Sequence, residues 1–156
     1  MNHSKTFGEF EVCEHCGQTT QYEEILCKGL VDVLSIIAQY IIKKGINAVH
    51  ISKELEKIQL LTPTQGKVAH SLHWWGLIEP VVGNPGNWSL TQIGLCFLQN
   101  KVNIPHSLLL KKKTWNNQPI VISESEERLH ITDIKNANVS YWEANTSRIL
   151  GGNIIN

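Results

Sequence analysis

The fold is decided by the stretch that joins a predicted helix to a predicted strand, Leu72-His73-Trp74-Trp75-Gly76-Leu77-Ile78-Glu79-Pro80. Leu72 and Trp75 recur at helical spacing, and Gly76 supplies a helix stop that turns the chain directly into an extended segment. Leu77 or Ile78 then covers the core that the end of the helix leaves open. The stretch therefore predicts a helix, a sharp stop and a strand in immediate succession.

The start of the same helix is as clear as its end. Thr62 as N-cap, Pro63 as first helical residue and Gln65 three positions after the cap form a capping-box pattern. We expect one helix over 63–75. Its predicted inward residues are Val68, Leu72 and Trp75.

Two more helices are predicted upstream. Apolar residues recur at helical spacing over 22–44, and Gly45 is a suitable stop for that helix. A short helix is predicted over 53–59, with Ser52 as its N-cap and Ile58 on its inward side.

Downstream, the pattern predicts a hairpin and a closing helix. Strands are expected over 77–82 and 87–90, joined by the turn Gly83-Asn84-Pro85-Gly86. Thr91 is the expected cap of a helix over 92–101. Its predicted inward face consists of Ile93, Cys96 and Phe97.

This order of elements resembles the winged helix-turn-helix superfamily over about 24–101. The residues that carry the likeness are the Gly76-Leu77-Ile78 junction and the segment Trp88-Ser89-Leu90-Thr91 with Gly94 and Phe97-Leu98 after it. The resemblance implies that helix 63–75 enters the DNA major groove and that the wing lies against the backbone or minor groove. A Cys-x-x-Cys-Gly knuckle before such a domain is also similar to uncharacterised phage and mobile-element proteins.

The whole chain is predicted to be α+β, a winged helix-turn-helix domain with a small antiparallel β extension. Residues 1–22 form a polar segment with the knuckle, and 23–102 the winged domain. Strands over 107–115, 119–122 and 128–131 make 103–135 a small β unit. An Asn-rich tail occupies 136–156.

Charge limits the choice of function. The chain has 14 basic and 14 acidic residues, which excludes a strongly basic polyanion binder as a description of the whole chain. Residues 28–101 hold seven Lys against four acids, a formal charge of +3 that fits phosphate contact. The candidate DNA-binding residues are Thr64, Gln65, Lys67, His70 and Lys53.

Two functional hypotheses follow. The first is a DNA-binding regulatory or accessory protein that uses helix 63–75. The alternative is a protein-protein interaction module on the same fold, favoured by a chain with only 2 Arg and by a wing turn without Lys or Arg. No phosphate-binding glycine loop, Gly-x-Ser-x-Gly or His-Glu-x-x-His motif occurs, so we do not expect an enzyme.

Cys13 and Cys16, followed by Gly17, have the spacing of half a zinc site. A closed structural site needs four ligands, and the other two are open. They could come from Cys27, from the nearby His3 and His15, from the His70 and His73 pair, or from the same cysteines of a second chain, and a knuckle without metal is the alternative. Cys27 and Cys96 are interpreted as small core residues, and the cysteine usage indicates a reducing, cytoplasmic protein.

Helix 22–44 is also the predicted homodimer contact. Its residues Ile36, Ile37, Ile41 and Ile42 give it more apolar width than the core face of a small domain needs. We expect no membrane partner, because the apolar run 30–42 is short and interrupted by polar residues, and 1–10 show no secretory signal.

Overall fold

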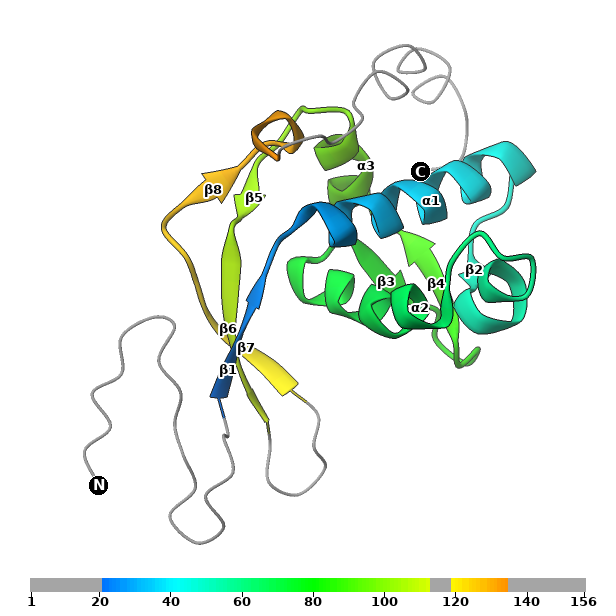
Figure 1. Ribbon diagram of the computed structural model, residues 1–156, viewed down its shortest axis with the longest axis horizontal. Coiled ribbons are helices and arrows are strands. Elements are labelled where there is room, and N and C mark those ends of the chain that lie inside the picture. Colours follow the sequence, from blue (N-terminus) through cyan, green and yellow to red (C-terminus); the bar gives the residue numbers. More distant parts are fainter. Residues whose placement is uncertain (1–20, 113–118, 135–156) are drawn as a thin grey trace, which may run out of the picture. The chain divides into compact units, whose positions relative to one another are not determined.

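The computed structural model describes residues 21–112 and 119–134 (Figure 1). The described residues form two compact units, one made of 21–26 with 105–112 and 119–128 and the other of 27–104 with 129–134. Helices and small antiparallel sheets make the structure mixed α+β, as the sequence predicts.

The larger unit begins with α1 (Lys28–Lys44), β2 (Val49–His50) and the π-helical η1 (Ile51–Glu56). It continues through α2 (Pro63–Ala69), the 3-10 helix η2 (His70–Trp75), β3 (Ile78–Pro80), β4 (Asn87–Leu90) and α3 (Gln92–Leu98). Figure 1 shows α1 lying across α2 and the strands, and it contacts α2, η2, β4 and α3.

Four predicted helix ends are confirmed. Gly45 and Gly76 both adopt left-handed conformations, with φ of 65° and 75°, that end the helices before them. Thr62 and Gln65 form the complete capping box at the start of α2. The Thr91 hydroxyl caps α3 by accepting a hydrogen bond from the Gly94 N–H at 3.0 Å.

The hairpin is present, and a third strand extends it. The sheet order is β2-β4-β3, with all neighbours antiparallel. Val49 and Pro80 are both paired with Trp88, from opposite sides of β4. The segment 45–50, between α1 and η1, thus contributes one short strand to the sheet.

The core of this unit lies beneath α1, whose inward face buries eight residues. The other fully buried large side chains include Leu55, Leu72, Leu77, Ile78 and Phe97. Three residues predicted inward are instead on the surface: Ile58 is 52% exposed, Val68 41% and Ile93 50%.

Val68 faces outward because the type of helix changes along this segment. The predicted helix 63–75 is an α-helix only to Ala69 and a 3-10 helix from His70 on. The small residues Gly66 and Ala69 face inward, which lets α2 approach η1 closely. In α3, the buried Gly94 plays the same part: a Cβ there would meet the Leu77 carbonyl oxygen, so Ile93 beside it points outward.

The predicted helix 53–59 is also wrong in its bounds and its cap. The helical turns begin at Ile51, and His50 rather than Ser52 caps them. His50 Nδ1 accepts a hydrogen bond from the Lys53 N–H at 3.1 Å, and the His50 N–H donates to Glu54 Oε1 at 3.1 Å. This reciprocal pair satisfies the donors that a helix start leaves open.

The predicted start of helix 22–44 is wrong, because its first residues belong to a strand of the smaller unit. Residues Gln21–Ile25 form strand β1, and α1 starts only at Lys28. The sheet order is β1-β6-β7, with β6 (Ser107–Lys112) central and β7 (Pro119–Glu124) antiparallel to it. A buried central strand needs partners for its backbone groups on both sides, and β1 supplies the second.

The predicted third strand 128–131 does not join that sheet. Only β8 (Arg128–Leu129) is extended, and it pairs with β5 (Ile104–Pro105). The 3-10 turn η3 (Ile131–Asp133) follows. The predicted end of strand 107–115 and the tail 136–156 lie outside the described residues.

The premise of the homodimer prediction is weakened. Ile37, Ile41 and Ile42 are buried in their own chain, and Ile36 is half-buried. Cys27, expected in the core, is exposed at the N-cap of α1. Among the described residues, no helix is long and apolar enough to cross a membrane.

Candidate nucleic-acid interface

The outward side of α2 and η2 carries three of the predicted DNA-binding residues. Thr64, Lys67 and His70 are all exposed and follow one another at intervals of three residues. Residues at this spacing share one face of a helix. The opposite face is buried through Gly66, Ala69 and Leu72. The exposed side chains can therefore approach a partner together, with the core behind them.

Gln65 is placed differently. Its side-chain Oε1 accepts a hydrogen bond from the Thr62 N–H at 2.9 Å, and its own N–H donates to Thr62 Oγ1 at 3.1 Å. Bidentate recognition of adenine requires both the amide oxygen and the amide nitrogen of a Gln. With the oxygen engaged in the capping box, Gln65 retains only its donor for a base.

The fifth predicted residue, Lys53, lies in η1. Its side chain is exposed, and its backbone N–H is held by the cap on His50 Nδ1. Because Nδ1 accepts that hydrogen bond, the His50 ring proton resides on Nε2. The Ser52 hydroxyl lies 3.3 Å from the same Nδ1. The start of η1 thus offers an exposed cation and a hydroxyl on a fixed backbone.

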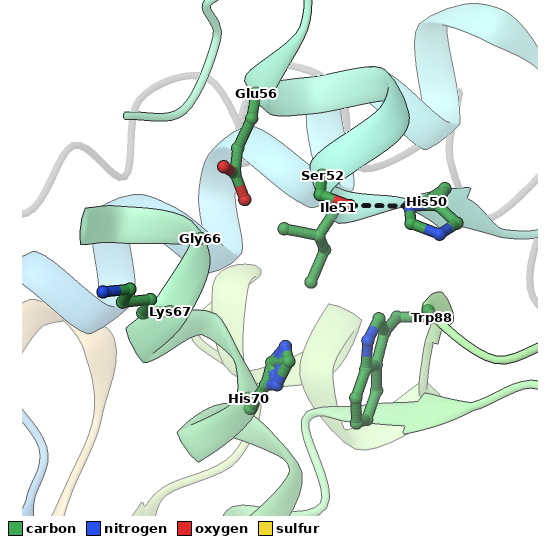
Figure 2. A pocket seen from close by; sticks show the side chains of 9 residues that line it. His50, Ile51, Ser52, Glu56, Gly66, Lys67, His70 and Trp88 are labelled. Atoms are coloured by element: carbon green, nitrogen blue, oxygen red, sulfur yellow. Dashed lines mark hydrogen bonds between the residues drawn. The ribbon is translucent and has the colours of Figure 1, made fainter. Parts of the chain in front are cut away.

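A hollow of about 270 Å³ lies between η1, α2 and β4 (Figure 2). We call it the Trp88 hollow. In Figure 2 the Trp88 and His70 rings face each other at one end and the Glu56 carboxylate points in from the other. Its lining residues are His50, Ile51, Ser52, Glu56, Gly66, Lys67, His70, Gly86 and Trp88.

Trp88 is the residue that sequence reasoning missed. The strand pattern over 87–90 does not single it out as a site residue, yet it is only half-buried and lines the hollow. Its ring centroid lies 5.3 Å from that of His70 and 5.8 Å from that of His73, both tilted. Aromatic rings at this distance attract one another. The contact ties strand β4 to the exposed face of η2, and the nearby glycine Gly86 was the signal of a close approach.

Two glycines shape the hollow. A Cβ on Gly86 would collide with the His50 ring, and a Cβ on Gly66 would collide with the Glu56 carboxylate. Gly86 also has a φ of 85°, which side-chain-bearing residues rarely adopt. The His50 and Glu56 side chains that line the hollow are therefore packed directly on glycine backbone.

The charges around this face are mainly positive at the surface. Lys53, Lys57 and Lys67 are exposed. The two acids of η1 are less exposed than these lysines. Glu54 accepts hydrogen bonds from the His50 N–H and, at 3.3 Å, from the Tyr40 hydroxyl, and Glu56 is half-buried in the hollow. The exposed potential of η1 and α2 thus favours an anionic partner.

The hairpin turn contributes no such charge. Its residues 81–86 contain neither Lys nor Arg. Val82 is 97% exposed at the tip. A hairpin turn of this composition can touch a partner by shape and apolar contact but does not neutralise phosphate.

The predicted zinc ligands Cys13 and Cys16 lie outside the described residues. Within residues 21–112 and 119–134, no three His, Cys, Asp or Glu side chains gather closely enough to hold a metal ion. Of the spare ligands considered, His73 lies with Nδ1 3.4 Å from the Ile78 carbonyl oxygen and His70 packs on Trp88. Cys27 stands exposed at the start of α1.

Comparison with known proteins adds no relative. No protein-family model, no curated protein and no solved structure matches the chain. The winged helix-turn-helix resemblance therefore stays a prediction from the sequence, based on the order of elements and on residues such as Gly76 and Thr91.

Proposed function

We propose that residues 27–104 form a winged helix-turn-helix domain that binds duplex DNA, in a regulatory or accessory role. The observation that carries the proposal is the exposed row Thr64, Lys67 and His70, backed by a buried face and started by a complete capping box. A helix presented in this way is rigid enough to enter the major groove without further ordering.

The contacts divide into two kinds. In this proposal, Lys53 and Ser52 at the start of η1 contact phosphate, which positions a protein on DNA without reading sequence. Thr64, Lys67 and His70 contact base edges, where Lys pairs with guanine. Because Gln65 is held by Thr62, we assign it to helix capping and not to base recognition.

Salt dependence tests the proposal. A fluorescein-labelled duplex of mixed sequence is titrated with protein, and the slope of log K against log salt is measured. Each phosphate contact that a Lys makes adds about 0.9 to the slope, so affinity falls about threefold to fourfold per contact from about 50 mM to about 200 mM salt. Lys53→Gln therefore makes the slope shallower by about 0.9, whereas Lys67→Gln weakens binding and reduces the preference among duplex sequences.

Lys101→Gln is the matched control, because Lys101 is also exposed but lies after α3. It removes the same charge and leaves the slope near that of the unaltered protein. A duplex that fails to bind even at low salt refutes the proposal, and so does an equal loss in all three variants.

A protein-interaction role is the second candidate, favoured by the exposed Val82 on a hairpin without cations. In that role, Val82→Ser reduces partner binding while Lys67→Gln has no effect. A cytoplasmic location fits the exposed free thiol of Cys27 and is part of the same proposal.

A further inference from the structure

A second hollow, of about 360 Å³, lies on the outer side of the C-terminal half of α1. We call it the Tyr40 hollow. It shares no residue with the Trp88 hollow. Its lining residues are Ile36, Gln39, Tyr40, Lys43, Lys44, Ile58 and Leu60.

Two aliphatic side chains form one wall and are held outward by the backbone. Ile58, which the sequence pattern predicts to be inward, is 52% exposed, and Leu60 is 45% exposed. Between them, Gln59 has a φ of 64°, in the left-handed region that residues other than Gly, Asn and Asp rarely occupy. The Leu60 and Leu61 N–H groups both donate to the Leu55 carbonyl, at 2.9 and 3.2 Å.

The left-handed backbone at Gln59 is energetically unfavourable, and this energy is not regained by burying Ile58 or Leu60, which stay exposed. A residue such as Gln in the left-handed region costs on the order of 1 kcal/mol. It ends the helical turns so that Ile58 and Leu60 flank the hollow instead of entering the core. Adjacent exposed aliphatic residues beside a hollow are typical of an interaction surface.

The charged residues that line the hollow are all cationic. Lys43 and Lys44 form its rim, and Lys44 Nζ lies 5.8 Å from the centroid of the Tyr40 ring. The carboxylate nearest to Tyr40 in the described contacts is that of Glu54, which accepts the Tyr40 hydroxyl hydrogen bond and does not line the hollow. The surface thus pairs an apolar floor with a positive rim.

We propose that the Tyr40 hollow docks an amphipathic segment of another protein, one whose apolar side chains are flanked by Asp or Glu. Apolar side chains would fill the space between Ile36, Ile58 and Leu60, and the acids would meet Lys43 and Lys44. A second copy of this chain fits less well. A two-fold contact on this patch places the same lysines of both chains close together, which is repulsive.

The test uses two designed helical peptides labelled with fluorescein. Both carry Leu at positions that share one face; one has Glu beside the Leu residues and its twin has Lys there. Fluorescence anisotropy with the full chain is expected to show binding of the Glu peptide at least about tenfold tighter than of the Lys peptide at low salt. Joint substitution Lys43→Glu with Lys44→Glu reverses that order.

Leu60→Ser removes part of the apolar wall and weakens the Glu peptide, whereas Ile93→Ser, an equally exposed aliphatic site on α3, does not. Circular dichroism shows that both variants are folded. Equal binding of the two peptides, or none, overturns the proposal. A concentration-dependent dimer in sedimentation that Leu60→Ser abolishes also overturns it, because a second copy would then occupy the hollow. None of these outcomes depends on DNA binding.

Discussion

Thr91 joins three parts of the larger unit through one hydroxyl group. Its Oγ1 donates to the Gly76 carbonyl at 2.5 Å and accepts from the Gly94 N–H at 3.0 Å. Thr91→Val keeps the shape and β-branching of the side chain but removes both hydrogen bonds. Loss of an N-cap costs about 1 kcal/mol, and a partly buried carbonyl left without its partner costs about 1 kcal/mol more. We expect the free energy of unfolding to fall by about 2 kcal/mol.

Thr62→Val is the matched control. The Thr62 hydroxyl caps α2 in the same way but is exposed, and the Thr62 N–H keeps its bond to Gln65 in the variant. Its expected cost is therefore about 1 kcal/mol. Urea unfolding followed by tryptophan fluorescence measures both, and Thr91→Ser, which retains the hydroxyl, should recover most of the loss. If Thr91→Val costs no more than Thr62→Val, the bond to Gly76 contributes nothing and the reasoning fails.

Four further predictions concern other parts of the chain. Gln59→Gly relieves the strain of the left-handed backbone, so the free energy of unfolding should rise by about 0.5–1 kcal/mol and the urea midpoint should rise with it. A lower midpoint would argue against strain at this position. Gly94→Ala should destabilise strongly in the same assay, since its Cβ meets the Leu77 carbonyl oxygen, and a neutral result would contradict the close packing. Burial raises the pKa of Glu24, so the folded state binds this proton more tightly than the unfolded state does. The free energy of unfolding should therefore fall as pH rises from the ordinary Glu pKa through the raised one. Glu24→Gln should remove that part of the pH dependence. For the predicted zinc site, metal analysis should give one zinc per chain if a single chain supplies all ligands and half a zinc per chain if two chains share the site. Cys13→Ser should abolish zinc binding in either case. A normally folded protein that is purified without zinc would mean that the knuckle binds no metal.

The candidate site was predictable where a residue's exposure follows from local helix geometry. Thr64, Lys67, His70 and Lys53 are exposed as expected. The sequence predicted two roles for Gln65, a contact with DNA bases and a place in the capping box. In the structure its side-chain oxygen accepts the hydrogen bond of the capping box. Trp88 could not be placed from the pattern of β4, because its half-buried position depends on His70 and His73, which approach from a distant helix.

The sequence by itself determined the ends of the elements in the larger unit. The helix caps formed by Thr62, Thr91, Gly45 and Gly76 act on backbone groups within five residues, so each of these helix ends follows from the local sequence. The hairpin that ends at Leu90 was predictable for the same reason, since its turn holds two glycines with positive φ. The second bond of Thr91, to the Gly76 carbonyl, joins residues fifteen positions apart and is not local.

Only the tertiary structure decided which segment completes the sheet around β6. Residues 21–25 continue the helical pattern of α1 in sequence, yet they are extended, because β6 offers backbone partners more than eighty residues away. The outward positions of Val68 and Ile93 have the same origin. Periodicity allows more than one inward face, and the close approach of Gly66 to η1 and of Gly94 to Leu77 selects the face that is buried.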